Sequence, residues 1–433
     1  ILGSGVFGLS TALALTQRPS FANSKITLVD RSPFPAPDGS STDTSRIIRP
    51  DYALPPYASL ASTAQSIWRD PASPFSAAYS ESGLALVANT GSQGEPYVRS
   101  SFSNVQRLHA EVGDTTGLKE LIGKEEIERE VGTGGGSGDW GYVNRRSGWA
   151  DAEAGMRILH ALVSSTRRVT FLTLTCTSLL YSPTSSTVVG AQFSKHPPIT
   201  ADLVILATGA WTPSLIDLRG RAQATGQVLC YLPLSDEEQE LLGRMPVLLN
   251  MSTGMFIIPP RNKLLKVARH GYGYSNPTSI TSPDPAAKVE GKRIEVSLPK
   301  TTYDDPGLQV PEEGQRACRQ ALREMIPSLA SRPFTSTKIC WYTDTPTGDF
   351  IITYHPSHRG LFLATGGSGH GYKFLPVIGE KIVDCIEGKL DPVLKGMWGW
   401  RKETVENVVT EDGSRGGKPG MVLGVEMRKG SKL

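Results

Sequence analysis

Residues 3–8 read GSGVFG, and this short turn constrains the fold more than any other segment of the chain. The G-x-G-x-x-G spacing follows two apolar residues and precedes a helix-forming run, as a strand–turn–helix unit requires. Glycines in such a turn let the backbone approach a pyrophosphate at the positive end of the helix. The sequence therefore predicts a dinucleotide-binding turn at Gly3, Gly5 and Gly8, and the short first strand leads us to expect that a few preceding residues, the start methionine among them, are absent.

An acidic residue stands where the partner of this turn belongs. Residues 25–29 (KITLV) read as a second strand that ends at Asp30, about twenty residues beyond the glycine turn. We expect Asp30 to accept hydrogen bonds from ribose hydroxyls. The turn itself does not distinguish FAD from NAD, but the buried-type strand LVIL at 203–206, followed by Ala-Thr-Gly209-Ala, is typical of two-domain FAD oxidoreductases.

Composition narrows the class of protein. The 433 residues have room for two or three domains, and 39% hydrophobic with 20% charged residues are ordinary for a soluble globular protein. A net charge of +3 is too small to indicate a nucleic-acid partner, and no apolar run predicts a membrane span. Five scattered cysteines without a C-x-x-C pair argue against a zinc site and indicate a reducing compartment without a disulfide framework. We expect a monomer.

Three other segments attract attention because of their composition. Residues 32–45 are rich in Ser, Pro, Thr and Asp and predict a loop. Residues 132–138 (GTGGGSG) predict a flexible loop, and no helix-forming run or lysine follows that would make it a phosphate cradle. The glycine-rich, charged tail at 411–420 is predicted to be mobile.

Four segments carry a resemblance to a known family: residues 40–49 (SSTDTSRIIR), 264–270 (LLKVARH), 339–346 (ICWYTDTP) and 366–374 (GGSGHGYKF). Together with the glycine turn they span nearly the whole chain. In this order they resemble the monomeric sarcosine oxidase family, whose relatives include pipecolate, saccharopine and fructosyl amino acid oxidases.

The resemblance implies an α/β (α+β) fold with two domains. A Rossmann-like FAD-binding domain would comprise residues 1–80, 149–214 and 336–433. A substrate domain containing an antiparallel sheet would comprise residues 81–148 and 215–335.

The same resemblance assigns roles to single residues. In the family, a cysteine at the position of Cys340 carries the flavin covalently, and the counterparts of Arg49 and Lys373 hold the substrate carboxylate. A guanidinium and an ammonium suit a carboxylate in a dry pocket. Arg46 would lie nearer the flavin; on a helix turn, its side chain and that of Arg49 would share one face.

Further matches complete the implied site. Lys266 matches the lysine at the flavin face where oxygen is reduced, since a fixed cation stabilises developing superoxide, and His270 matches an active-site histidine. Phe256 falls near a tyrosine of the sarcosine pocket, which indicates a substrate other than sarcosine. Thr42 stands where the sarcosine oxidases have a histidine, so that part of the site differs. A helix after residue 373 is expected to point its N-terminus at the flavin pyrimidine. Further cofactor-binding residues implied are Ser45, Gly209, Gly367, Gly369, His370, Gly371 and Lys373.

The implied reaction is FAD-dependent oxidation of a secondary amine or N-substituted amino acid, such as saccharopine, pipecolate or an N-methyl amino acid, with oxygen as acceptor. It gives an imine and hydrogen peroxide, in catabolism or in a biosynthetic pathway. Alternatives are a fructosyl amino acid (Amadori product) oxidase, a flavin dehydrogenase passing electrons to a carrier protein, and a flavin-binding regulator. Fructosyl oxidases often lack the counterpart of Lys373, and a dehydrogenase has no use for the oxygen-activating Lys266.

The chain ends in Ser431-Lys432-Leu433, the tripeptide read by the peroxisomal import receptor. The basic pair Arg428-Lys429 stands just before it. We therefore expect the protein to be soluble in the peroxisome lumen and to have the import receptor as a partner. An oxidase that produces peroxide is also safest beside catalase.

Overall fold

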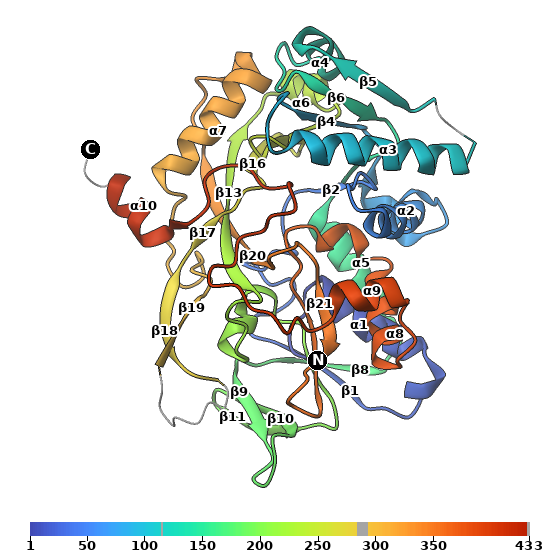
Figure 1. Ribbon diagram of the computed structural model, residues 1–433, viewed down its shortest axis with the longest axis vertical. Helices are drawn as coiled ribbons and strands as arrows, with labels where there is room; N and C mark the ends of the chain where they lie inside the picture. The colour runs from blue at the N-terminus through green and yellow to red at the C-terminus, as the bar shows by residue number, and fades with distance from the viewer. Residues whose placement is uncertain (114–115, 284–292, 431–433) are drawn as a thin grey trace.

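The computed structural model describes residues 1–113, 116–283 and 293–430. The C-terminal tripeptide 431–433 lies outside the described residues, so the peroxisomal prediction is not tested by the fold. Figure 1 shows a lower half with α1, α5 and α8 beside a short sheet, and an upper half built on one large twisted sheet.

A parallel sheet organises the half that contains the N-terminus. Leu2 bridges Val29 and Leu206 in parallel and so stands at the centre of the sheet. On one side of Leu2 lie β1 (Ile26–Asp30) and β8 (Val169–Thr173), which pair in parallel. On its other side lie β12 (Val204–Leu206) and β22 (Leu361–Thr365), also parallel, with β21 (Ile351–Tyr354) antiparallel at the edge. This strand order is that of a Rossmann-like nucleotide-binding sheet.

Apolar residues on alternate positions of these strands bury both faces of the sheet. Leu28, Ile205 and Phe362 face the core that contains residues of α1 (Val6–Gln17), α5 (Ala152–Ser165) and α8 (Ile378–Ile386). The neighbouring strand residues Val29, Leu206 and Leu363 face the opposite way, toward a three-stranded sheet of β9 (Cys176–Tyr181), β10 (Val188–Phe193) and β11 (His196–Thr200). Successive side chains of a strand point to opposite faces, so a sheet that is covered on both faces has apolar residues pointing both ways.

The second half is a ten-stranded, mainly antiparallel sheet. Its order is β23-β17-β13-β16-β15-β14-β4-β6-β5, and β20 also pairs with β13. The bounds are β4 (Leu84–Ala88), β5 (Leu118–Ile122), β6 (Trp140–Asn144), β13 (Gln223–Pro233), β14 (Val247–Asn250), β15 (Met255–Arg261), β16 (Leu264–Arg269), β17 (Tyr274–Ser275), β20 (Ser336–Asp344) and β23 (Met421–Val422). Helix α7 (Glu312–Met325) packs on one face through Cys318, Leu322 and Met325.

The fold prediction is confirmed, because a Rossmann-like sheet and an antiparallel sheet are both present. The domain boundaries stay a prediction; β20, which the sequence assigned to the FAD-binding domain, pairs with β13 of the large sheet.

The remaining elements are β2 (Arg46–Ile48), β3 (Tyr79–Ser80), β7 (Gly148–Ala150), β18 (Pro277–Thr281), β19 (Arg293–Ser297), α2 (Pro55–Arg69), α3 (Glu95–Glu111), α4 (Lys124–Val131), α6 (Asp236–Leu242), α9 (Pro392–Trp398), α10 (Leu423–Gly430) and 3-10 turns at Pro19–Phe21, Pro74–Ala78, Gly209–Ser214, Pro327–Leu329 and Gly371–Phe374.

Three local expectations are wrong. Arg46 begins the strand β2, so it does not share a helix face with Arg49. The helix expected after residue 373 is confirmed, since α8 begins at Ile378, after a 3-10 turn at Gly371–Phe374. The loop at 132–138 is packed rather than free, since a Cβ on Gly135 would lie 2.2 Å from the Glu324 carbonyl oxygen. In the tail, residues 414–416 are buried.

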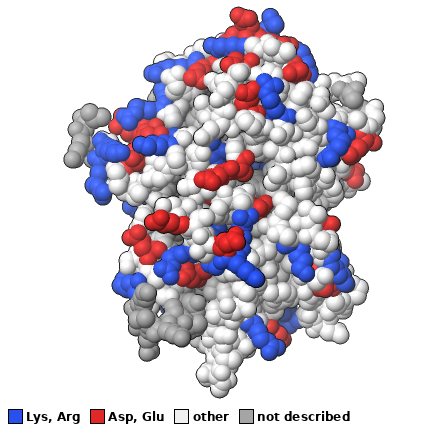
Figure 2. All heavy atoms as spheres, viewed as in Figure 1, with Lys and Arg blue, Asp and Glu red and all other residues white. Residues whose placement is uncertain are grey.

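The surface agrees with the small net charge. On the face drawn in Figure 2, Lys and Arg side chains lie interspersed with Asp and Glu, and no broad area of one sign stands out. Among the described helices, none has the length and apolar character needed to cross a membrane.

Candidate active site

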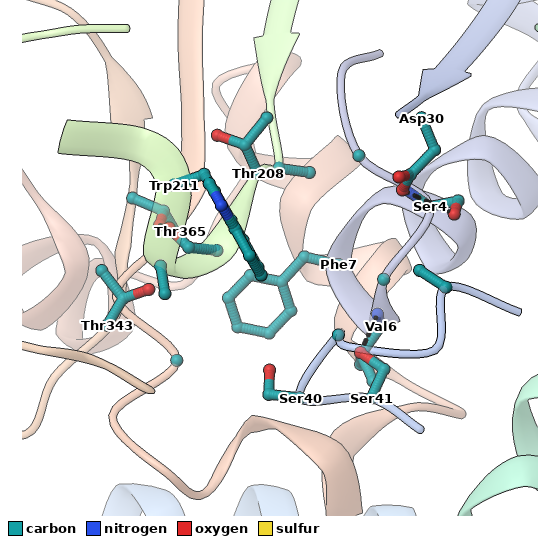
Figure 3. A pocket seen from close by; sticks show the side chains of 18 of the residues that line it. Ser4, Val6, Phe7, Asp30, Ser40, Ser41, Thr208, Trp211, Thr343 and Thr365 are labelled. Carbon is teal, nitrogen blue, oxygen red and sulfur yellow. Dashed lines mark hydrogen bonds between the residues drawn. The ribbon is translucent and has the colours of Figure 1, made fainter. Parts of the chain in front are cut away.

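A cavity of about 320 Å³ lies where the parallel sheet meets the large sheet. Its walls come from the glycine turn, the end of β1, the loop at 36–42, the turn after β12 and the glycine run after β22. Figure 3 shows Ser4 facing Asp30 on one side, Ser40 and Ser41 from the loop below, and Trp211, Thr208 and Thr365 opposite. The cavity thus lies at the carboxyl ends of the parallel strands, where this type of sheet binds its ligand.

The glycine turn is shaped by contacts that no side chain would tolerate. Gly3 has φ of +103°, and a Cβ there would lie 2.3 Å from the Ala207 carbonyl oxygen. A Cβ on Gly8 would lie 1.9 Å from the Gly3 carbonyl oxygen, so Gly8 permits the close packing of helix on strand but does not itself line the cavity. Gly5, which precedes α1, and Val6, its first residue, both line the cavity, so the positive helix terminus faces it. The Ser41 hydroxyl accepts a hydrogen bond from the backbone N of Val6 at 3.1 Å.

The carboxylate of Asp30 stands beside this helix terminus. Its Oδ2 accepts hydrogen bonds from the backbone N and the Oγ of Ser4, both at 2.7 Å. Gly209, Gly367, Gly369 and Gly371 line the other end of the cavity. These features fit FAD. The helix N-terminus suits a pyrophosphate, the carboxylate suits ribose hydroxyls, and glycines line the far end of the cavity.

A buried polar cluster surrounds Asp43 next to the cavity. Nζ of Lys266 donates to Asp43 Oδ2 at 3.1 Å and to the Ser45 carbonyl oxygen at 2.5 Å, and Arg46 pairs with the same carboxylate. Tyr231 donates from its hydroxyl to Asp43 Oδ1 at 2.7 Å. Burial raises the pKa of Asp43, but the neighbouring cations outweigh it and hold the pKa well below its usual range. Burial also lowers the pKa of Lys266 to about 8, although Asp43 opposes this shift.

Cys340 lies on β20 beside this cluster. Its side chain is 2% exposed and shares a small apolar core with Leu229 and Ala268, on the face of the large sheet opposite α7. Nη2 of Arg46 lies 3.6 Å from the Cys340 sulfur. Arg46 lines the cavity, whereas Cys340 is not among the residues that line it.

A second polar group gathers Arg49, Lys373, Tyr52 and His370. Nζ of Lys373 donates to the Tyr52 hydroxyl at 2.9 Å and to the His370 carbonyl oxygen at 3.3 Å. The Tyr52 hydroxyl is 2.9 Å from Nδ1 of His370, whose Nε2 is 2.8 Å from the Gly348 carbonyl oxygen. Because that oxygen can only accept, Nε2 carries the proton and Nδ1 accepts from Tyr52. Burial, and then Arg49, lower the pKa of Lys373 well below its usual value.

Arg49 is 6% exposed, and its Nη1 is buried without a hydrogen-bond partner among the described residues. The guanidinium carbon lies 5.2 Å from the ring centre of Tyr52 and 6.0 Å from that of Tyr97. A buried guanidinium with a free N–H is well suited to bind an anion.

Phe256 and His270 lie at the same face of the large sheet. Phe256, on β15, is half-buried with its ring centre 6.0 Å from Nζ of Lys266. His270 follows the end of β16, its ring centre 5.9 Å from that of Tyr342, which lines the cavity. Lys266, Ala268 and His270 alternate along the chain and so share one side of the sheet.

Together, the Rossmann-like sheet, the dinucleotide cavity and the basic cluster beside it define a flavoprotein oxidoreductase. The chain belongs to the FAD dependent oxidoreductase (DAO) family, whose family model matches residues 1–385. Amino acid oxidase imqH of Aspergillus flavus is 31% identical over 450 residues, 90% of this chain and 94% of the relative. L-saccharopine oxidase of Schizosaccharomyces pombe is 31% identical over 422 residues, 93% of each chain.

A solved structure, a thermally stable mutant of a fructosyl peptide oxidase, superposes with a TM-score of 0.85. It is 24% identical, covers 98% of this chain and 96% of its own, and at that identity shows the fold alone. With the sequence relatives, the family makes this protein an FAD-dependent amino acid or amine oxidase that acts on CH–NH bonds.

Sequence reasoning did not single out four residues: Asp43 and Tyr52 of the two polar clusters, and the ion pair of Asp344 and Arg415, whose guanidinium lies beside His270. Asp43 stands inside the recognised segment 40–49, and its position three residues before Arg46 was an available signal. Tyr52 and Asp344 adjoin or lie in recognised segments but carry no motif of their own. Arg415 lies in the tail, which composition wrongly predicts to be mobile.

Proposed function

We propose that this protein oxidises a secondary amine or N-substituted α-amino acid with a free carboxylate, and produces an imine and hydrogen peroxide. The observation that carries the proposal is Arg49, a buried guanidinium whose Nη1 lacks a partner within the described part of the chain. Leaving such a donor unmet costs stability, so the site is best explained by an anionic ligand. The family supplies the reaction class, and the names of the relatives make amino acids the natural substrates to test.

The roles of the chain's own groups follow from their contacts. Arg49 and Lys373 bind the carboxylate, and Tyr52 fixes the direction of the lysine amine. Buried surroundings exclude water and favour an uncharged substrate amine, as oxidation at the adjacent carbon requires. Bound FAD supplies the hydride acceptor for that C–H bond and the electrons for reducing oxygen to hydrogen peroxide.

We further propose that Cys340 bonds FAD covalently and that Lys266 assists the reduction of oxygen. The contact between Arg46 and the Cys340 sulfur supports the first role. The burial of Lys266, held by Asp43 and the Ser45 carbonyl oxygen, supports the second, since a lysine fixed in this way cannot move away from its place. The C-terminal tripeptide supports a peroxisomal location.

The test is anaerobic reduction of the purified flavoprotein by matched pairs of substrates. Each amino acid of a panel is compared with its methyl ester; the panel contains pipecolate, saccharopine, N-methyl amino acids and a fructosyl amino acid. Bleaching of the flavin by acids but far less by esters is the expected result, with stoichiometric peroxide after air is admitted. Equal reduction by acids and esters would contradict the carboxylate site, and reduction by the fructosyl compound alone would select the Amadori oxidase.

A further inference from the structure

Part of the C-terminal tail packs against the end of β16 at His270. The backbone N of Gly416 donates to the His270 carbonyl oxygen at 3.1 Å, and Gly271 and Gly416 form a parallel bridge. A Cβ on Gly416 would lie 2.0 Å from the Thr253 carbonyl carbon, so the close approach requires glycine. Upstream, the hydroxyl of Thr410 donates to the Thr345 carbonyl oxygen at 2.8 Å. The tail is thus fixed on both sides of Arg415.

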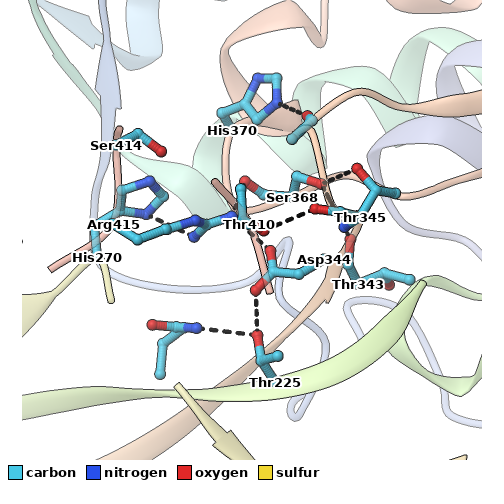
Figure 4. A network of polar contacts seen from close by, with 12 residues as sticks. Thr225, His270, Thr343, Asp344, Thr345, Ser368, His370, Thr410, Ser414 and Arg415 are labelled. Carbon is cyan, nitrogen blue, oxygen red and sulfur yellow. Dashed lines mark hydrogen bonds and ion pairs between the residues drawn. The ribbon is translucent and has the colours of Figure 1, made fainter. Parts of the chain in front are cut away.

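Arg415 is 5% exposed and joins a continuous polar network (Figure 4). Its Nη2 donates to Asp344 Oδ1 at 2.6 Å and to the Ser368 carbonyl oxygen at 2.9 Å. The other carboxylate oxygen of Asp344 accepts from the Thr225 hydroxyl. The ion pair therefore has little freedom to reorient, because both of its members are held by further hydrogen bonds.

The network ends at the imidazole of His270, where Nη1 of Arg415 lies 3.3 Å from Nδ1. A guanidinium has only donors, so Nδ1 must present its lone pair, and a neutral ring carries its proton on Nε2. No described residue hydrogen-bonds Nε2, and the ring is half-buried on the cavity side of the large sheet. Burial lowers the pKa of His270 well below its usual value, and Arg415, Arg49, Lys373 and His370 lower it further.

We propose that Arg415 and Asp344 are positioning residues, which hold His270 as the neutral Nε2–H tautomer so that Nε2 donates a hydrogen bond to the substrate carboxylate. The inference rests on the proposed function for the identity of the acceptor, but the tautomer itself does not depend on it. A neutral donor orients the substrate without adding positive charge beside the carbon that loses hydride. The sequence element that sets this state is the tail, far from His270 along the chain.

The first test observes the tautomer directly by ¹⁵N NMR of histidine-labelled holoenzyme, with His270 assigned by loss of its signals in His270→Gln. We expect an unprotonated Nδ1 and a protonated Nε2 in the wild type across the neutral range. In Arg415→Met, removal of the cation and release of the Asp344 carboxylate should raise the pH at which His270 protonates. A wild-type ring with its proton on Nδ1, or a charged ring at neutral pH, would overturn the proposal.

The second test is a double-mutant cycle on anaerobic flavin reduction by an amino acid found to be a substrate. Arg415→Met should lower the second-order rate constant about tenfold, as loss of one well-oriented hydrogen bond does. A glutamine amide replaces the Nε2–H donor and has no imidazole tautomer to set. In the His270→Gln background, Arg415→Met should therefore change the rate less than about twofold.

Equal losses in the two backgrounds would mean that Arg415 only supports the structure, and would overturn the proposal. Lys418→Met, which removes an exposed cation of the same tail, is the matched control and should leave both readouts unchanged. If Arg415→Met does not fold, Asp344→Asn tests the same pair: the rate of flavin reduction should again fall, but the pH at which His270 protonates should fall as well, because an anion is removed and the charge of Arg415 is left unneutralised. Failure of every amino acid to reduce the wild type would refute the proposed function, while the NMR result would still decide the tautomer.

Discussion

Replacing Arg49 by methionine tests the carboxylate site most directly. The guanidinium is buried, contacts the rings of Tyr52 and Tyr97, and keeps Nη1 free of partners in the described residues. Methionine keeps much of the apolar volume and removes the charge. The nearby buried carboxylate of Asp51 stays hydrogen-bonded to Tyr142, Asn144 and Ser147, so the variant is expected to fold.

The magnitude follows from the contact that is lost. A hydrogen bond to a charged group in a buried site contributes about 2–3 kcal/mol, which corresponds to roughly 30–150-fold in kcat/KM for an amino acid. A methyl ester offers only a neutral acceptor, worth about 1 kcal/mol or roughly fivefold. The preference of the enzyme for acid over ester should therefore fall about 6–30-fold in Arg49→Met.

The assay is anaerobic stopped-flow reduction of the flavin with each substrate pair, at equal flavin content and after the melting temperatures are compared. Arg99→Met is the matched control, because this half-exposed arginine on α3 stacks on Trp140 away from the site. Equal losses for acid and ester would refute the assignment of Arg49 to the carboxylate.

Three further predictions concern the flavin, oxygen and location. Acid-precipitated wild type should stay yellow while Cys340→Ala releases its colour to the supernatant; flavin that washes out of the wild type would disprove the covalent bond. Lys266→Met should slow reoxidation of the reduced flavin by oxygen and leave anaerobic reduction nearly unchanged. Because Lys266 is charged below its pKa of about 8, wild-type reoxidation should fall as pH rises through that value and be flat in the variant. A fluorescent protein fused to the N-terminus should collect in peroxisomes, and deletion of Leu433 should leave it in the cytosol. A diffuse signal from the intact fusion would contradict the role of the C-terminal tripeptide as a peroxisomal targeting signal.

The cofactor half of the protein was predictable because its signals are local. The glycine spacing, the following helix and Asp30 at the end of the next strand each depend on neighbouring residues, and the structure places Gly3, Gly5 and Asp30 around one cavity. The resemblance extended this to the segments that bring Arg46, Cys340 and Lys266 together. The helix expected after the glycine run is present as α8, which begins at Ile378 after a 3-10 turn.

The prediction made from composition is wrong for the tail, because tertiary packing determines the structure there. The tail at 411–420 has the glycine and charge content of a mobile segment, yet Arg415 is buried and bonded to Asp344. Its charge is satisfied by a partner 71 residues away, which no local pattern reveals. The glycine content indicated a mobile segment, but in the structure glycine allows the tail to lie close against the strand end at His270.

The sequence by itself determined the dinucleotide turn, the class of cofactor and the set of basic and aromatic residues available to a site. Only the tertiary structure decided which charges are neutralised and which stay free. Lys266 meets Asp43 across 223 residues, whereas Arg49 keeps a buried donor without a partner in the described chain. The reason is physical: a side chain's pKa, tautomer and unmet hydrogen bonds depend on the groups packed around it, and long-range chain paths select those groups.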